Sequence, residues 1–263
     1  MHVYTTALSR LVPILLFASF CLILGRWLHD LILPRSRAAA RVLFSAVLVL
    51  GGFCVTPYCR RLVLLVWCAK AFDDSQWGVV DASMSQFRSL GGTESIAMNC
   101  SWAVALINVG KPQKAEAVLL SRLKVHNGQV EAVPQQILLL GTARYYERNF
   151  RGAVRTLGAV GEQRGLRLFL RDYLIGRSHE ALKEPELAMS FYGRATAREP
   201  RFYPAVYHLA RLQAEAGHRD DGLRTLTLFS EQDRNDATLA APALASMRRG
   251  QPLPNVEFQI VQN

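Results

Sequence analysis

A large residue followed directly by a small one recurs four times in this chain, and each time a second small residue follows twelve positions after the first. A bulky residue then stands four positions further on. Small residues let two helix backbones approach closely enough for ridges to pack into grooves. The spacing therefore predicts pairs of antiparallel helices. The four copies are Trp102-Ala103 with Ala115 and Leu119, Leu140-Gly141 with Ala153 and Leu157, Ile175-Gly176 with Ala188 and Tyr192, and Leu209-Ala210 with Gly222 and Leu226.

The copies recur at a nearly constant period. Successive copies are 38, 35 and 34 residues apart, counted from Ala115 to Ala153, Ala188 and Gly222. A period of this length is typical of a solenoid, in which each helix pair buries its apolar face against the next pair. A helical bundle with accidental spacing is the alternative, but amphipathic helices alone do not fix a constant step. The longer first step predicts an extended loop near Asn127-Gly128.

The copy over residues 175–200 carries the fullest pattern. Ala188, Tyr192 and Ala195 follow at helical spacing, and Pro200 ends the second helix because proline lacks the backbone N–H that a helix requires. The pattern resembles the tetratricopeptide repeat, a helical hairpin with a period of 34 residues. The resemblance covers about residues 62–235. It implies an all-α fold with an α-solenoid of four to five helix pairs.

A fifth, weaker copy precedes the other four. Projecting the period back by 35 residues from the first copy reaches Val80, and Gln76-Trp77 lies where the second helix of a pair would begin. Residues 62–72 would then form the first helix. A plain interfacial helix is the alternative for this stretch. No Pro/Ser-rich tether separates it from the apolar residues before it, so we expect a rigid connection.

The N-terminal part of the chain is strongly apolar. Residues 11–25 form an unbroken apolar run, and residues 42–58 form a second run that only Gly51-Gly52 and Thr56-Pro57 interrupt. Each run is slightly shorter than the about 20 residues that span a bilayer, and flanking residues can complete it. We predict a transmembrane helical hairpin over residues 1–60 and an integral membrane protein. A cleaved signal peptide is disfavoured, because Arg26-Trp27 stands where a small-x-small cleavage site would be expected.

The side of the membrane that holds the repeats is nearly undetermined. Lysine and arginine are equally numerous in the connecting loop and on the terminal side, and such residues favour the cytoplasmic side. Discounting Lys70 as the most distant gives a slight preference for repeats on the exoplasmic or periplasmic side. The loop carries Arg26, Arg35, Arg37 and Arg41, and the terminal side carries Arg10, Arg60, Arg61 and Lys70.

The sequence contains no recognisable catalytic motif. His179-Glu180 begins a zinc-helix pattern, but Lys183 stands where the second histidine would be needed. The five cysteines form no C-x-x-C pair, which gives no metal site and no disulfide framework. The net charge of +10 includes no run of five lysines or arginines, so a solvated basic face is favoured over a site for an acidic partner or anionic lipid. We therefore predict no enzyme, no cofactor and no nucleic-acid partner.

A protein-binding surface remains as the expected functional feature. In the tetratricopeptide family a concave groove is lined by residues of the first helix of each pair. Tyrosine and arginine dominate such recognition surfaces, because one offers rigid contact area and the other a fork for carboxylates. The resemblance implies a groove for an extended or helical protein segment of acidic character, while packing of several tyrosines between repeats is the alternative. The assigned residues are Tyr145, Tyr146, Tyr173, Arg177, Glu180, Tyr207, Arg211 and Glu215.

The C-terminal residues are expected to close the solenoid. Asp236 is a plausible N-cap for a helix that runs to Arg249 and ends at Gly250, and such a helix could cap the repeats. Residues 256–262 alternate apolar and polar side chains, which predicts either an extended arm that docks on a neighbour or a disordered end.

Three segments result: a transmembrane hairpin at 1–60, a solenoid at 61–235, and a capping helix with an extended tail at 236–263. We expect a membrane-anchored scaffold or adaptor that holds protein partners. The alternative is an accessory or assembly subunit of a larger membrane complex. The adjacent Gly51-Gly52 would permit close packing of membrane helices and favours that alternative.

Overall fold

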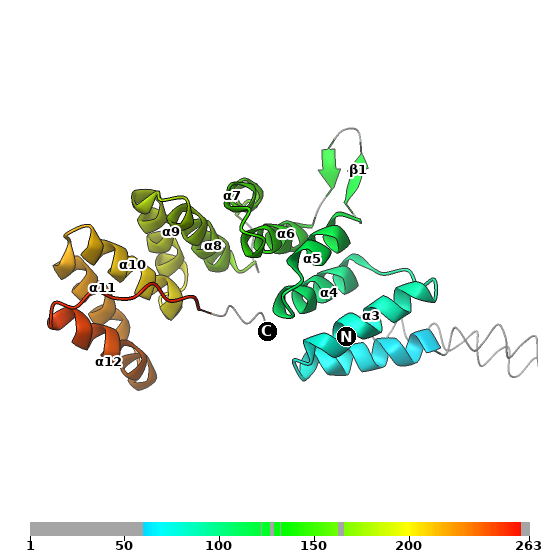
Figure 1. Cartoon of the computed structure of the whole chain (residues 1–263), viewed down its shortest axis with the longest axis horizontal. Coiled ribbons are helices and arrows are strands. Elements are labelled where there is room, and N and C mark those ends of the chain that lie inside the picture. Colours follow the sequence, from blue (N-terminus) through cyan, green and yellow to red (C-terminus); the bar gives the residue numbers. More distant parts are fainter. Residues whose placement is uncertain (1–59, 122, 127–128, 132, 163–165, 259–263) are drawn as a thin grey trace, which may run out of the picture. The chain divides into compact units, whose positions relative to one another are not determined.

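The computed structural model describes residues 60–121, 123–126, 129–131, 133–162 and 166–258 (Figure 1). The chain divides into two units between Thr93 and Glu94, and each unit is described by itself. The predicted transmembrane hairpin, apart from position 60, lies outside the described residues. Within the described residues, no helix combines the length and the apolar character that crossing a bilayer requires.

The first unit contains the weak fifth copy as a helix pair. Residues 60–73 are helical, and helix α3 follows at Trp77–Ser89. Cys68 and Val80, which stand twelve positions apart like the small residues of the other copies, are 9% and 0% exposed. The pair therefore forms where the projected period predicted it. Three apolar side chains of the first helix remain exposed: Val63, Val66 and Trp67.

The second unit is built from four further helix pairs and one last helix (Figure 1). Each helix packs against the next one along the chain. This order of contacts is the solenoid arrangement that the period predicted. The pairs are α4 (Ile96–Asn108) with α5 (Pro112–Leu120), α6 (Pro134–Tyr146) with α7 (Phe150–Gly158), α8 (Leu168–Ala181) with α9 (Pro185–Arg198), and α10 (Tyr203–Glu215) with α11 (Arg219–Ser230), followed by α12 (Arg234–Arg248).

The described part of the fold is all-α as predicted, with one short β-hairpin between two of the helices. Strands β1 (Lys124–His126) and β2 (Gln129–Glu131) pair antiparallel between α5 and α6, with Val125 opposite Val130. The sequence predicted only a longer loop here. An Asn-Gly step between β-branched residues is in fact a strong local signal for a hairpin. The additional residues of the longest repeat therefore form a hairpin of their own.

The small residues of the repeat lie where two helices touch. A Cβ atom built on Gly176 would approach the Tyr192 ring to 2.7 Å and the Ala188 carbonyl oxygen to 3.3 Å. On Gly222 it would lie 2.6 Å from the Ala210 carbonyl oxygen. Real Cβ atoms do not come so close, so only glycine permits these helix contacts. The twelve-residue spacing is confirmed as the spacing of paired helices.

A left-handed residue ends the first helix of each described pair. It stands seven positions after the small residue of that helix, and its amide bonds a carbonyl of the last turn, as at a helix C-cap. Glycine is the usual residue there, but serine, arginine and lysine occupy three of the positions. The residues and their φ angles are Ser75 at 56°, Gly110 at 73°, Arg148 at 61°, Lys183 at 66° and Gly217 at 89°.

A buried ion cluster fastens α8 to α9. Asp172 on α8 is fully buried and accepts hydrogen bonds from Arg171 Nε at 2.9 Å and from Arg198 Nε of α9 at 2.7 Å. Arg171 also donates to the Val160 carbonyl oxygen at 2.7 Å. A buried carboxylate is tolerated only when paired in this way. The cluster therefore fixes the α7–α8 connection as well as the helix pair.

Helix α12 begins earlier than the sequence predicted. Its N-cap is Asp233, whose side chain accepts a hydrogen bond from the Asn235 amide at 3.2 Å. Asp236, the expected cap, lies in the first turn and accepts a hydrogen bond from Arg201 Nε at 3.1 Å. Gly250, with φ of 78°, follows the helix end. The expected cap residue instead fastens α12 to the connection before α10.

Candidate protein-binding groove

Six of the eight predicted groove residues line one cavity of about 810 Å³. They come from the first helices of three successive pairs, α6, α8 and α10. Exposed Arg148 and Lys183, the left-handed residues that follow α6 and α8, add two positive charges to the lining. We call this cavity the groove. The six residues are Tyr145, Tyr146, Arg177, Glu180, Arg211 and Glu215.

The other two predicted residues do not line the cavity. Tyr173 is 1% exposed and packs with ring-centroid distances of 5.1 Å to Phe202 and 5.8 Å to Tyr192. It belongs to the core between repeats, so its assignment to a binding surface is wrong. Tyr207 is 5% exposed, and its hydroxyl donates to the Pro254 carbonyl oxygen at 2.9 Å. That hydroxyl already binds an extended segment of the same chain.

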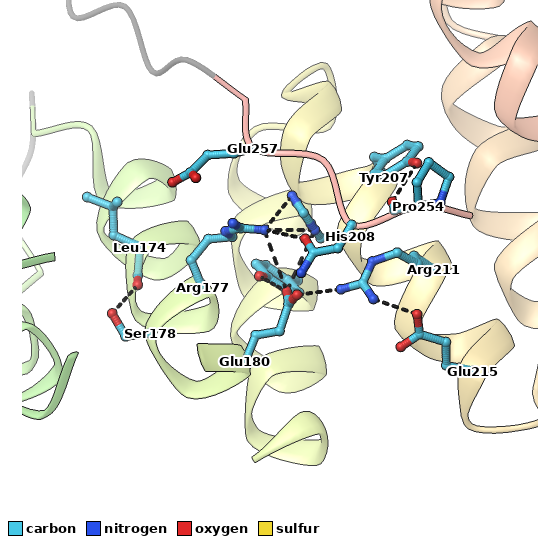
Figure 2. Close-up of polar contacts among 12 residues, drawn as sticks. Leu174, Arg177, Ser178, Glu180, Tyr207, His208, Arg211, Glu215, Pro254 and Glu257 are labelled. Carbon is cyan, nitrogen blue, oxygen red and sulfur yellow. Dashed lines mark hydrogen bonds and ion pairs between the residues drawn. The ribbon is translucent and has the colours of Figure 1, made fainter. Parts of the chain in front are cut away.

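Glu180 stands at the centre of the polar contacts in the groove (Figure 2). Its Oε1 accepts a hydrogen bond from Arg211 Nη2 at 2.5 Å, and its Oε2 accepts one from the Tyr192 hydroxyl at 2.7 Å. Arg177 Nη1 lies 3.8 Å from the same Oε2. Arg211 Nη1 donates to Glu215 Oε1 at 2.5 Å. Both arginines expected to bind a partner's carboxylates therefore bind carboxylates of their own chain.

Sequence reasoning missed His208, which is fully buried and lies beside the groove residue Arg177 (Figure 2). Arg177 Nη1 lies 3.0 Å and 3.3 Å from the two ring nitrogens of His208. Burial of the ring, together with the charges of Arg177 and Arg211, lowers the pKa of His208 to about 2. The imidazole is therefore neutral and can accept a hydrogen bond from Arg177. In the sequence, the one feature that pointed to His208 was its position next to the predicted groove residue Tyr207.

The C-terminal segment 251–258 runs from the end of α12 across α10 towards α8 (Figures 1 and 2). Arg177 Nη1 donates to Asn255 Oδ1 at 3.1 Å, and the Tyr145 hydroxyl donates to Glu257 Oε1 at 3.3 Å. Burial raises the pKa of the Tyr145 phenol, so the hydroxyl keeps the proton that it donates. The segment that sequence reasoning left as an arm or a disordered end thus contacts the groove residues.

Apolar contacts hold the same segment. Leu253 is 6% exposed and belongs to the cluster formed by α10, α11 and α12. The Phe258 ring packs edge-on to Tyr207 and His208 at centroid distances of 5.4 Å and 5.6 Å, and its centroid lies 5.8 Å from that of Tyr203. These aromatic pairs add contact energy beyond simple burial. We call residues 251–258 the tail.

The described residues offer no arrangement for metal chemistry. They contain no group of three or more His, Cys, Asp or Glu side chains placed to hold an ion. Burial raises the pKa of the Cys100 thiol to about 11, so this thiol stays protonated.

Fold and site together define an α-helical repeat protein. No protein-family model matches the chain, and no curated protein matches it. Several solved structures share the fold, and two of them serve as examples. One, described as the crystal structure of MamA, aligns with a TM-score of 0.50 at 14% identity over 68% of this chain and 96% of that chain. The other, described as the crystal structure of MamA protein, has a TM-score of 0.50 at 13% identity over 75% and 98%.

Proposed function

We propose that the chain is a scaffold whose groove binds an extended segment of a protein partner. The observation that supports this most is the tail, which hydrogen-bonds the groove residues Tyr145 and Arg177 and packs its aromatic ring on the adjacent helix α10. A surface that binds one extended segment has the donors and the apolar seats to bind another.

We also propose that the scaffold is anchored in a membrane. The two apolar runs of the sequence support this, and so does the exposed apolar face of the helix at residues 60–73, where Val63, Val66 and Trp67 are 56%, 68% and 65% exposed. Exposed apolar patches mark partner or membrane contacts. Within this proposal, the count of lysine and arginine slightly favours repeats on the exoplasmic or periplasmic side.

The proposed function is tested by partner capture with full-length protein in mild detergent, with bound proteins identified by mass spectrometry. Tyr146→Ala is the preferred groove variant, because Tyr146 lines the groove and is not one of the arginines that pair with Glu180. Removing Arg177 and Arg211 together would leave Glu180 without its ion pairs and so confound binding with stability. Leu239→Ala on α12 is the control, since that side chain is 53% exposed and does not line the groove.

A partner captured by the wild type and by Leu239→Ala but lost from Tyr146→Ala is the expected result. Equal capture of the partner by the wild type and by Tyr146→Ala would contradict a role for the groove. The accessory-subunit alternative predicts a different outcome: capture would then depend on close helix contact at Gly51-Gly52 and would be lost on replacing both glycines with leucine.

A further inference from the structure

The tail has the burial pattern of a bound peptide ligand. Beyond the anchoring Leu253, Val256 and Phe258 are partly buried, whereas Asn255 and Glu257 are exposed. Side chains of an extended chain alternate between its two faces. One apolar face therefore lies on the helices, while the polar side chains reach Arg177 and Tyr145 at its edges.

Two residues of α10 beside the groove bind the backbone of the tail. The Tyr207 hydroxyl donates to the carbonyl oxygen of Pro254 at 2.9 Å, and the His208 ring hydrogen-bonds the Val256 backbone. Every extended peptide offers such backbone groups, whatever its side chains. These contacts therefore recognise an extended conformation. The apolar surfaces that contact the Val256 and Phe258 side chains favour peptides with apolar residues at those two positions.

The hydrogen bonds of the tail side chains Asn255 and Glu257 are easily exchanged. The Asn255 hydrogen bond is exposed to solvent, and the Glu257 side chain that accepts from Tyr145 is itself exposed. Water competes for hydrogen bonds at such sites, so each one contributes little net stability. A tethered segment nevertheless competes strongly, since its effective concentration is on the order of millimolar.

We propose that the tail is a built-in ligand of the groove, and that a partner binds by displacing it with a segment of the same chemistry. Such a segment is extended and carries two apolar residues two positions apart, the second of them aromatic, with a carboxylate between them. The inference rests on the proposed function and assigns the partner class. The carboxylate position agrees with the positive lining at Arg148 and Lys183.

The test uses a synthetic, fluorescently labelled peptide with the sequence of residues 250–258. Its binding to full-length protein in mild detergent is followed by fluorescence anisotropy. The variant Val256→Ser/Phe258→Ser weakens the tail but keeps Leu253 and every groove residue. Leu228→Ser/Leu239→Ser is the matched control, because it also exchanges two apolar residues for serine, at sites on α11 and α12 that are 55% and 53% exposed.

The proposal predicts that the peptide binds the weakened-tail variant at least about tenfold tighter than it binds the wild type or the control, because the tethered competitor is lost. Adding Arg177→Ala to the weakened-tail variant should then reduce peptide binding. Equal binding to all variants overturns the proposal, as does binding to none. If the peptide binds none while partner capture remains sensitive to Tyr146→Ala, the built-in ligand fails and the proposed function stands. If both experiments fail, the groove itself is not a binding site.

Discussion

At the scale of single residues, the helix contacts depend on the absence of a side chain. Gly222→Ala would place a methyl group 2.6 Å from the Ala210 carbonyl oxygen and 2.6 Å from Met247 Cε. We expect a loss of about 2 kcal/mol in the free energy of unfolding, as for other overpacked sites. Gly193→Ala on α9 is the control, since a methyl group there meets no atom within 4 Å. Alanine has a higher helix propensity than glycine, so Gly193→Ala should raise the free energy of unfolding by up to about 1 kcal/mol. Chemical denaturation of both variants measures the difference, and equal effects would contradict the packing account.

His208 gives a prediction about pH. Its pKa falls from 6.5 to about 2 in the folded protein, so the unfolded chain takes up a proton below pH 6.5 while the folded chain does not. Stability is therefore fully present above about pH 7 and falls as the pH is lowered, by about 2 kcal/mol at pH 5. The groups facing the ring are Arg177, Arg211 and Glu180. His208→Gln should lose less stability than the wild type between these two pH values. Parallel pH profiles of thermal unfolding would contradict this assignment.

At the scale of the elements, the left-handed residue after each first helix sets the turn into the second. Gly217 has φ of 89°, and a Cβ there would meet no atom within 4 Å, so any cost of a side chain is purely one of backbone conformation. Gly217→Ala should therefore destabilise the protein by about 1 kcal/mol. Lys183→Gly, at the equivalent position with φ of 66°, should shift stability in the opposite direction. Urea titrations of both variants measure these changes. An unchanged free energy of unfolding in Gly217→Ala would show that the turn tolerates a side chain at this position.

The elements also show why some positions were predictable and others were not. The helix pairs followed from the spacing of small residues, because close backbone approach leaves little choice of residue at those points. The start of α12 was misplaced because Asp233 and Asp236 are both acceptable caps, and Arg201 binds both carboxylates, so their spacing alone did not tell which one caps the helix. Local spacing carries no record of such long-range pairing.

At the scale of the whole molecule, six of the eight predicted groove residues line one cavity, because a helical repeat places equivalent positions on one face. Tyr173 was assigned to that face but packs into the core, where aromatic neighbours from the next repeat cover it. The tail was unpredictable as a ligand, since its contacts with Tyr145 and Arg177 span 112 and 78 residues of sequence. The charges of Arg177 and Arg211 suggested free sites for a partner's carboxylates, but both arginines pair with Glu180.

The proposed membrane anchor makes a prediction about extraction. Full-length protein should stay in the membrane pellet during an alkaline carbonate wash and enter the supernatant only with detergent, because spanning apolar helices are not removed by breaking ionic contacts. Release by carbonate alone would contradict the integral anchor and would favour surface attachment through the exposed face that carries Val66 and Trp67.

The most direct test of the account asks where the tail lies in solution. Phe258 is replaced by photoreactive p-azidophenylalanine in the full-length protein in mild detergent, and the sites of crosslinking are mapped by mass spectrometry. The account predicts crosslinks within the same chain to α10, at Tyr203, Tyr207 or His208, which surround the Phe258 ring. An excess of the unlabelled peptide of residues 250–258 should reduce them. Crosslinks scattered over other helices, or none to α10, would contradict a groove that holds an extended segment.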